Sequence, residues 1–177
     1  MKNLEFKIND NITNRLSDLL DLNKNILITG KDGVGKTTLL KKIIGEISEE
    51  NREIYIVSEF KDEFIKDDDI FNNSRVKAML DPVESIDILK EVYRKNEVKK
   101  NKITIIIDNL FKYLNENKDN IRIANKIALG SLDGINVISS RRWRDDIPSI
   151  IKDKYLIKYS FDGIGCIIVK NRYLLNF

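Results

Sequence analysis

The chain has 177 residues, of which 42% are hydrophobic and 33% charged, and its formal net charge is +3. This composition is typical of one soluble globular domain, expected to span residues 1–177, and it excludes a uniformly basic protein that coats nucleic acid. Histidine is absent and Cys166 is the only cysteine, which excludes a Ser-His-Asp triad, an internal disulfide and a cysteine-based zinc site. Because no apolar run approaches the roughly 20 residues of a membrane span and no signal peptide is visible, we expect a cytoplasmic protein.

Strands and helices are predicted to alternate along most of the chain. Strands are expected at Leu4–Ile8, Asn25–Thr29, Glu53–Ser58, Lys102–Asp108, Gly134–Ser140 and Tyr155–Ser160. Helices are expected from Asn11 to about Leu22, at Thr37–Glu50, from Asp81 to about Lys100, at Asp119–Leu129 and at Pro148–Lys152, and residues 59–75 are expected to form a loop. The segment Gly165–Phe177 predicts a hairpin that turns at Lys170–Arg172. The alternation predicts an α/β fold, with a mainly parallel sheet and helices on both faces.

The start of one predicted helix carries its own signal. Asp81 is expected to be the N-cap, Pro82 fits the first helical position, and Glu84 stands where a capping box needs an acidic side chain.

A glycine-rich motif lies between the strand at Asn25–Thr29 and the helix that follows it. Residues 30–37 read GKDGVGKT and match G-x-x-x-x-G-K-[ST], the P-loop pattern that binds nucleotide phosphates. Its backbone N–H groups and the helix N-terminus would bind phosphate oxygens, while Lys36 neutralises the β- and γ-phosphates, Thr37 binds Mg²⁺ and Thr38 reaches the α-phosphate. ATP and Mg²⁺ are therefore the expected cofactors. The predicted binding residues are Gly30, Lys31, Asp32, Gly33, Val34, Gly35, Lys36, Thr37 and Thr38.

An acidic residue at the end of a second strand is expected to complete the site. Asp108 closes the most apolar strand and is predicted to hold Mg²⁺ with Thr37, a role compatible with capping the next helix. Asn109 stands where many P-loop ATPases carry glutamate, and its amide can position a water molecule but cannot accept a proton. We therefore expect ATP binding with weak or absent hydrolysis, unless Glu59 or Asp62 supplies the missing carboxylate. The predicted catalytic residues are Lys36, Asp108, Asn109, Ser140 and Arg141.

Four stretches together resemble the FtsK/SpoIIIE–HerA group of P-loop motor ATPases, and the similarity covers most of residues 20–177. They are ILITGKDGVGKTTLL, LDPVESIDILKEVYR, ITIIIDNLFKYL and the segment from Ala124 to Phe161. The resemblance implies a RecA-like fold with a C-terminal β-hairpin and a role in DNA translocation or protein secretion. The family's catalytic glutamate is Asn109 here, and its sensor glutamine and proline are Arg141 and Trp143. These departures resemble the degenerate C-terminal ATPase domains of type VII secretion motors.

This resemblance also implies the partners. They are further copies of the chain or other ATPase domains of a larger motor, with DNA or a secreted protein as cargo. The chain would then be the cytosolic part of a membrane-associated complex, without direct membrane insertion. Ser140 would sense the γ-phosphate, and the cluster Arg141, Arg142 and Arg144 would serve as an arginine finger, a channel lining or simply a solvated turn.

Other interpretations stay open from the sequence. Lys31 resembles the second loop lysine of ParA- and MinD-type P-loops, although a solvated loop lysine explains it as well. The turn SSRRWRDDIP also resembles AAA+-like helicase loaders, against which the chain has no room for a helical lid. A module that keeps the fold but binds only proteins is the third alternative, and Asn109 favours it.

Overall fold

The computed structural model describes residues 5–6, 25–47, 51–142, 157–161 and 166–170, and the structural statements below concern these residues. The helices predicted at Asn11–Leu22 and Pro148–Lys152 lie outside them. No helix in the described part of the chain is both long enough and apolar enough to cross a membrane.

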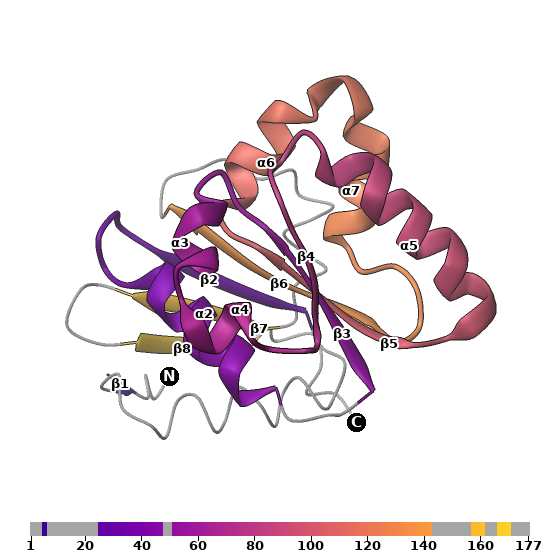
Figure 1. Ribbon diagram of the computed structural model, residues 1–177. Coiled ribbons are helices and arrows are strands. Elements are labelled where there is room, and N and C mark those ends of the chain that lie inside the picture. The colour runs from indigo at the N-terminus through magenta and orange to yellow at the C-terminus, as the bar shows by residue number, and fades with distance from the viewer. Residues whose placement is uncertain (1–4, 7–24, 48–50, 143–156, 162–165, 171–177) are drawn as a thin grey trace, which may run out of the picture.

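The described strands form one twisted sheet in the order β1-β8-β7-β2-β6-β5-β3-β4 (Figure 1). Strands β7, β2, β6, β5, β3 and β4 run parallel to one another, whereas β8 is antiparallel to β7 and β1 is antiparallel to β8. The parallel arrangement brings the carboxyl ends of β2, β5 and β6 to the same edge of the sheet. The bounds are β1 Glu5–Phe6, β2 Ile26–Gly30, β3 Arg52–Val57, β4 Val76–Leu80, β5 Lys102–Ile107, β6 Ile135–Arg142, β7 Ile157–Phe161 and β8 Cys166–Lys170.

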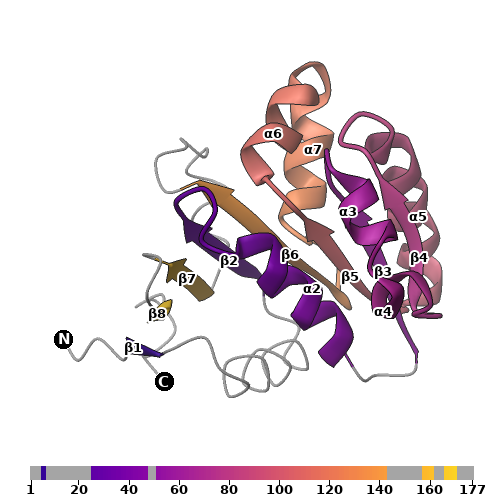
Figure 2. The same cartoon turned by 60° about the vertical axis from the view of Figure 1, so that its left-hand side comes forward.

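Helices cover both faces of the sheet (Figure 2). Their bounds are α2 Lys36–Glu46, α3 Lys61–Ile65, α4 Asp68–Phe71, α5 Ser85–Lys99, α6 Leu110–Glu116, the 3₁₀ turn η1 Lys118–Asn120 and α7 Ile121–Ala128. Helices α2, α3 and α4 pack on one face through a core that includes Leu40, Ile43 and Phe64. Helices α5, α6 and α7 pack on the other face through a core that includes Leu89 and Tyr113. Strand β5, which carries four isoleucines, lies between β6 and β3 and contributes side chains to both cores.

The predicted α/β fold with a mainly parallel sheet is confirmed, and one local expectation is wrong. Residues 59–75 contain α3 and α4 instead of a loop, because Phe64 and Ile70 are buried against the core beside α2, and β4 follows them. The C-terminal part of the sheet has an antiparallel pair, formed by β7 and β8, and β7 pairs with β2 on its other side. The expected turn at Lys170–Arg172 extends beyond the described residues.

The hydrogen bonds of the predicted capping box before α5 are present, but the helix itself begins at Ser85 with Glu84 as its N-cap, later than the expected start at Asp81 and Pro82. Asp81 Oδ1 accepts from the backbone N–H groups of Val83 (2.9 Å) and Glu84 (3.0 Å), and Glu84 Oε1 accepts from the backbone N–H of Asp81 (3.0 Å). The backbone bond from Glu84 is the main cause that lowers the pKa of Asp81, since these bonds favour the charged carboxylate. Hydrogen bonds between residues close together in the sequence therefore fix the turn that leads into α5.

Candidate functional site

A pocket of about 430 Å³ lies at the carboxyl ends of the parallel strands, between the glycine-rich loop and the start of α6. In open parallel sheets, ligands bind at this edge. Its lining residues are Asp32, Gly33, Gly35, Lys36, Thr37, Thr38, Phe60, Asp108, Asn109, Ser140 and Arg141. Eight of these residues belong to the phosphate loop or to the catalytic set predicted from the strand at Lys102–Asp108 and its following residue. Ser140 and Arg141, which were also predicted, come from β6 and line the same pocket.

The loop between β2 and α2 has the backbone that a phosphate cradle requires. Gly33 and Gly35 have φ angles of 76° and 92°, a left-handed conformation that residues with a Cβ rarely adopt. The backbone N–H of Leu39 donates to Gly35 O at 2.9 Å, so α2 begins directly at the loop. The first N–H groups of α2 and its positive end consequently face the pocket.

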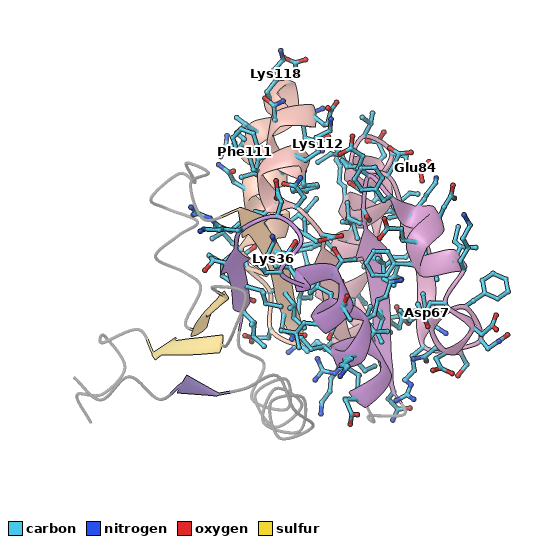
Figure 3. The ribbon with its side chains drawn as sticks, turned by 90° about the vertical axis from the view of Figure 1, so that its left-hand side faces the viewer. Lys36, Asp67, Glu84, Phe111, Lys112 and Lys118 are labelled. Atoms are coloured by element: carbon cyan, nitrogen blue, oxygen red, sulfur yellow. The ribbon has the colours of Figure 1, made fainter. Side chains whose placement is uncertain are left out.

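Lys36 supplies the positive charge of the loop, and Figure 3 shows it within this curve of the chain. Its ammonium group donates to Gly30 O at 3.1 Å and to Lys31 O at 2.7 Å. These backbone bonds hold the ammonium over the loop, at the place where a bound phosphate would meet it.

Asp108 joins three parts of the site. Its Oδ2 accepts from Thr37 Oγ1 at 3.0 Å, and its Oδ1 accepts from Ser140 Oγ at 2.6 Å. The Ser140 hydroxyl in turn accepts from the backbone N–H of Asn109 at 2.8 Å. The beginning of α2 and the ends of β5 and β6 are therefore linked through one carboxylate.

The donor set of Thr37 and Asp108 fits a magnesium ion that is bound together with a nucleotide. A hydroxyl and a carboxylate oxygen are hard ligands of the kind that Mg²⁺ prefers, and Mg²⁺ in such sites takes its other ligands from water and phosphate. The described residues contain no group of three or more His, Cys, Asp or Glu side chains that would hold a metal without a nucleotide. A site with one carboxylate and one hydroxyl is what nucleotide-dependent metal binding requires.

Asn109 has a local structural reason to be asparagine. Its φ of 64° lies in the left-handed region, and its Oδ1 accepts from the backbone N–H of Lys112 at 3.1 Å, so it caps α6. Asparagine tolerates this conformation better than most residues with a Cβ. The side-chain oxygen at the position of the expected catalytic residue is therefore engaged with the helix.

The remaining predicted residues lie in different places around the pocket. Gly30 is buried at the end of β2, Val34 packs against the core beside α2, and Lys31 is exposed on the loop outside the pocket lining. Arg142 ends β6, while Trp143 and Arg144 lie outside the described residues.

Phe60 lines the pocket although the sequence did not single it out. It is 60% exposed and follows the end of β3, the strand beside β5. The only signal in the sequence is its position two residues after the strand at Glu53–Ser58, next to Glu59.

An ion-pair cluster lies next to the pocket at the first turn of α6. Lys112 Nζ is 3.2 Å from Glu59 Oε1 and 3.0 Å from Glu116 Oε1 (Figure 3 shows Lys112 on α6). Hydrogen bonds with Glu116 and then Glu59 raise the pKa of Lys112 above its usual value, so the lysine is charged at neutral pH. Asp62, the other carboxylate considered from the sequence, lies in the first turn of α3 and is not part of the pocket lining.

A larger cavity, of about 900 Å³, opens at the opposite edge of the sheet. It lies at the amino ends of β3 and β5 and is lined by basic side chains such as Arg75, Lys77 and Lys102. We assign nucleotide chemistry to the smaller pocket, because only that pocket combines left-handed glycines, a helix N-terminus and a carboxylate joined to a hydroxyl.

Solved structures with the same fold include several secretion and conjugation ATPases. ATPases 2 and 3 of Thermomonospora curvata EccC superpose with a TM-score of 0.58 at 12% identity, covering 82% of this chain and 37% of that one. EscN of the enteropathogenic E. coli type III secretion system gives 0.57 at 12% identity, with 80% and 43% covered. The pCW3 conjugation coupling protein TcpA gives 0.53 at 19% identity, with 79% and 49% covered. The chain thus spans less than half the length of each of these proteins.

At these identities the likeness establishes the fold, which is that of a RecA-like P-loop NTPase. No curated protein matches the chain. A family model described as NTPase matches residues 25–123, which is more than half of the chain and includes the loop, Asp108 and Asn109. The chain belongs to this NTPase family.

Proposed function

We propose that the chain is an ATP-binding, motor-type domain of the FtsK/SpoIIIE superfamily, with residues 1–177 forming one domain. The observation that carries the proposal is the junction at Asp108, which bonds Thr37 of the loop helix and Ser140 of β6 directly beside Lys36. A phosphate cradle, a cation and a pair of metal ligands converge there, as ATP with Mg²⁺ requires.

Each residue of the pocket has a defined role in this proposal. The backbone N–H groups of Gly33–Lys36 bind the phosphates, Lys36 moves its ammonium from the loop carbonyls to the β- and γ-phosphates, and Thr38 binds the α-phosphate. Thr37 and Asp108 hold Mg²⁺, which when bound neutralises charge on the phosphates. Ser140 fixes the Asp108 carboxylate and senses the terminal phosphate, and Arg141 lies at the same edge to stabilise negative charge.

Hydrolysis is slow in this proposal. Asn109 replaces the glutamate that activates water in many P-loop ATPases, and its Oδ1 is bound to the start of α6. An amide lacks the basic oxygen that takes a proton, a contribution worth about 10²–10⁴-fold in rate.

The proposed setting follows the resemblance to secretion and conjugation motors. The structure of EccC ATPases 2 and 3 holds a signal-sequence peptide, and another is of the cytoplasmic domain of that type VII secretion ATPase. We place this chain in the cytoplasm, assembled with copies of itself or with other ATPase domains, and acting on DNA or a secreted protein. The helicase-loader alternative would lead us to expect a helix after the last parallel strand. In the described part of the chain, the next element after β7 is the strand β8, so nothing there favours that alternative.

Phosphate release from ATP tests this proposal, measured for the purified chain and for Lys36→Ala with Mg²⁺, and repeated with DNA at several salt concentrations. We expect slow, Mg²⁺-dependent release that Lys36→Ala abolishes, and DNA-dependent acceleration if DNA is the cargo. Equal release by both proteins would refute the assigned site.

A further inference from the structure

We infer that the cavity of about 900 Å³ at the amino ends of β3, β4 and β5 is a second anion site, which binds a ligand through several linked phosphate groups. The inference goes beyond the proposed function, because this cavity lies at the opposite edge of the sheet from Lys36 and shares no described lining residue with the smaller pocket. Its basis is a concentration of positive charge. Among the described lining residues Glu53 is the only acidic one, whereas five are basic. They are Arg52, Arg75, Lys77, Lys100 and Lys102.

The strand pairing brings three of these basic residues side by side. Arg52 pairs with Lys102 at the first position of β3 and of β5. The backbone N–H of Ile54 donates to Arg75 O at 2.9 Å, so Arg75 lies along the other edge of β3, directly before β4. Like charges placed together repel one another, and a bound anion with several negative charges would remove that repulsion.

Arg52 supplies a fixed charge in the wall of the cavity. It is 1% exposed, and its Nη1 donates to Thr104 Oγ1 at 3.1 Å and to Asn136 Oδ1 at 2.8 Å. A guanidinium stays charged at any physiological pH, and salt screens a buried charge less than an exposed one. Arg52 therefore attracts an anion through its electric field, whereas the more exposed side chains make the direct contacts.

Arg75 is oriented before any ligand binds. Its Nε donates to Asn73 Oδ1 at 3.2 Å, and its Nη1 donates to the backbone oxygen of Ile47. Within the described residues its Nη2 makes no hydrogen bond, so this nitrogen has N–H groups for a phosphate oxygen. A guanidinium that is held in place loses little conformational entropy when it binds a phosphate.

Lys77 and Lys100 supply the exposed positive charge. Lys77 Nζ donates to Ser74 O at 2.9 Å, which leaves further protons for a ligand, and Lys100 is the C-cap of α5 directly before β5. Neither ammonium forms an ion pair with a carboxylate in the described part of the chain. By contrast, the exposed Lys61 pairs with Glu84 at 3.0 Å.

The acidic lining residue does not neutralise these lysines. Glu53 Oε2 accepts from the hydroxyl of Tyr55 at 3.0 Å, and Glu53 Oε1 accepts from Asn101 Nδ2 at 3.3 Å. Both donors are neutral, and no described lysine or arginine forms an ion pair with this carboxylate. The positive charge of Lys77 and Lys100 is thus left for a ligand.

The composition of the lining selects the class of ligand. None of the described lining residues is apolar, so they offer no surface on which a base would stack or an acyl chain would lie. One phosphate group would balance only part of the charge, whereas linked phosphates accept from guanidinium and ammonium donors at successive positions. The phosphates belong either to a free polyphosphate or to the backbone of a nucleic acid, and the recognition chemistry is the same for both.

Calorimetric titration of inorganic tripolyphosphate tests the inference, using the full chain with Lys36→Ala in EDTA so that the smaller pocket contributes little. In this background, Lys77→Gln combined with Lys100→Gln is expected to weaken binding about tenfold or more, since two charge contacts are lost. Lys90→Gln combined with Lys118→Gln is the matched control. It removes two exposed charges outside the cavity and is expected to change the affinity less than about twofold.

Two further arms sharpen the test. Glu53→Gln removes the acidic charge and is expected to tighten binding about two- to threefold, a direction that a folding defect does not produce. Single-stranded oligothymidylate is then added as a competitor. Displacement of tripolyphosphate assigns the cavity to a nucleic-acid backbone, and no displacement assigns it to a free polyphosphate.

Three results would overturn the inference. They are no tripolyphosphate binding by the Lys36→Ala chain at millimolar concentration in about 0.15 M salt, equal weakening by the control pair, and weaker binding by Glu53→Gln. Because the lysines replaced are exposed, their variants are expected to keep the fold, and a thermal melt of each checks this. Failure of this site would leave the nucleotide pocket unaffected, since ATP binding there depends on Lys36.

Discussion

Replacing Asn109 tests whether this residue is kept for the backbone and cap of α6. Asn109→Ala removes the Oδ1 acceptor of the Lys112 N–H, which costs about 1 kcal/mol for an N-cap. It also places a Cβ residue without a polar group at φ 64°, which costs roughly 1 kcal/mol more. Asn109→Gly keeps the left-handed backbone and typically costs only a few tenths of a kcal/mol at a cap.

The melting temperatures of the two variants separate these contributions. With roughly 2–4 °C per kcal/mol for a chain of this size, Asn109→Ala is expected to melt about 4–8 °C below the natural chain and Asn109→Gly about 1–2 °C below it. Thermal unfolding followed by circular dichroism, with urea unfolding as a second measure, gives both values. Equal destabilisation by alanine and glycine would refute the backbone argument, and no effect from either would refute the cap.

Three further predictions concern other elements. Asp81→Ala is expected to cost about 1 kcal/mol at neutral pH. Because the pKa of Asp81 is lowered in the folded chain, this stabilisation is present above the ordinary aspartate pKa and is lost as pH falls through the folded value. Urea unfolding at falling pH should therefore show the difference in unfolding free energy between the natural chain and the variant shrink. A growing difference would contradict this. Gly134→Ala is expected to lower the melting temperature by at least about 4 °C, since Gly134 has φ 82° and an added Cβ would lie 2.9 Å from Asn101 O; an unchanged melt would contradict the assigned conformation. Ser140→Ala removes the 2.6 Å bond to Asp108 and should weaken ATP binding more in Mg²⁺ than in EDTA, whereas equal weakening in titrations would contradict the metal role of that carboxylate.

Local sequence signals predicted the parts of the site that depend on neighbouring residues. The spacing of Gly30–Thr37 between a strand and a helix predicted the phosphate loop, because the glycines and the helix N-terminus are determined within one short segment. Asp81 and Glu84 predicted the start of α5 for the same reason. The strand ending at Asp108 is the most apolar in the sequence, and this predicted its central, parallel position.

The missed features depend on contacts between distant segments. Strand β4 is a half-buried edge strand, so its sequence lacks a strong apolar pattern. Helices α3 and α4 are too short to show a helical period. Only the packing of Phe64 and Ile70 against the core identifies these helices. The proximity of Glu59 to the start of α6 arises from the pairing of β3 with β5. The sequence offers both Glu59 and Asp62 as carboxylates, and it cannot show that Glu59 pairs with Lys112 whereas Asp62 lies in the first turn of α3.

Titration of a non-hydrolysable ATP analogue tests the central claim most directly, performed calorimetrically on the natural chain with and without Mg²⁺ and on Lys36→Ala. The structure predicts one Mg²⁺-dependent site per chain, with affinity lost in the Lys36→Ala variant that removes the loop ammonium. Absence of binding to the natural chain at millimolar analogue, or equal binding by the two proteins, would contradict the assignment of this pocket to a nucleotide.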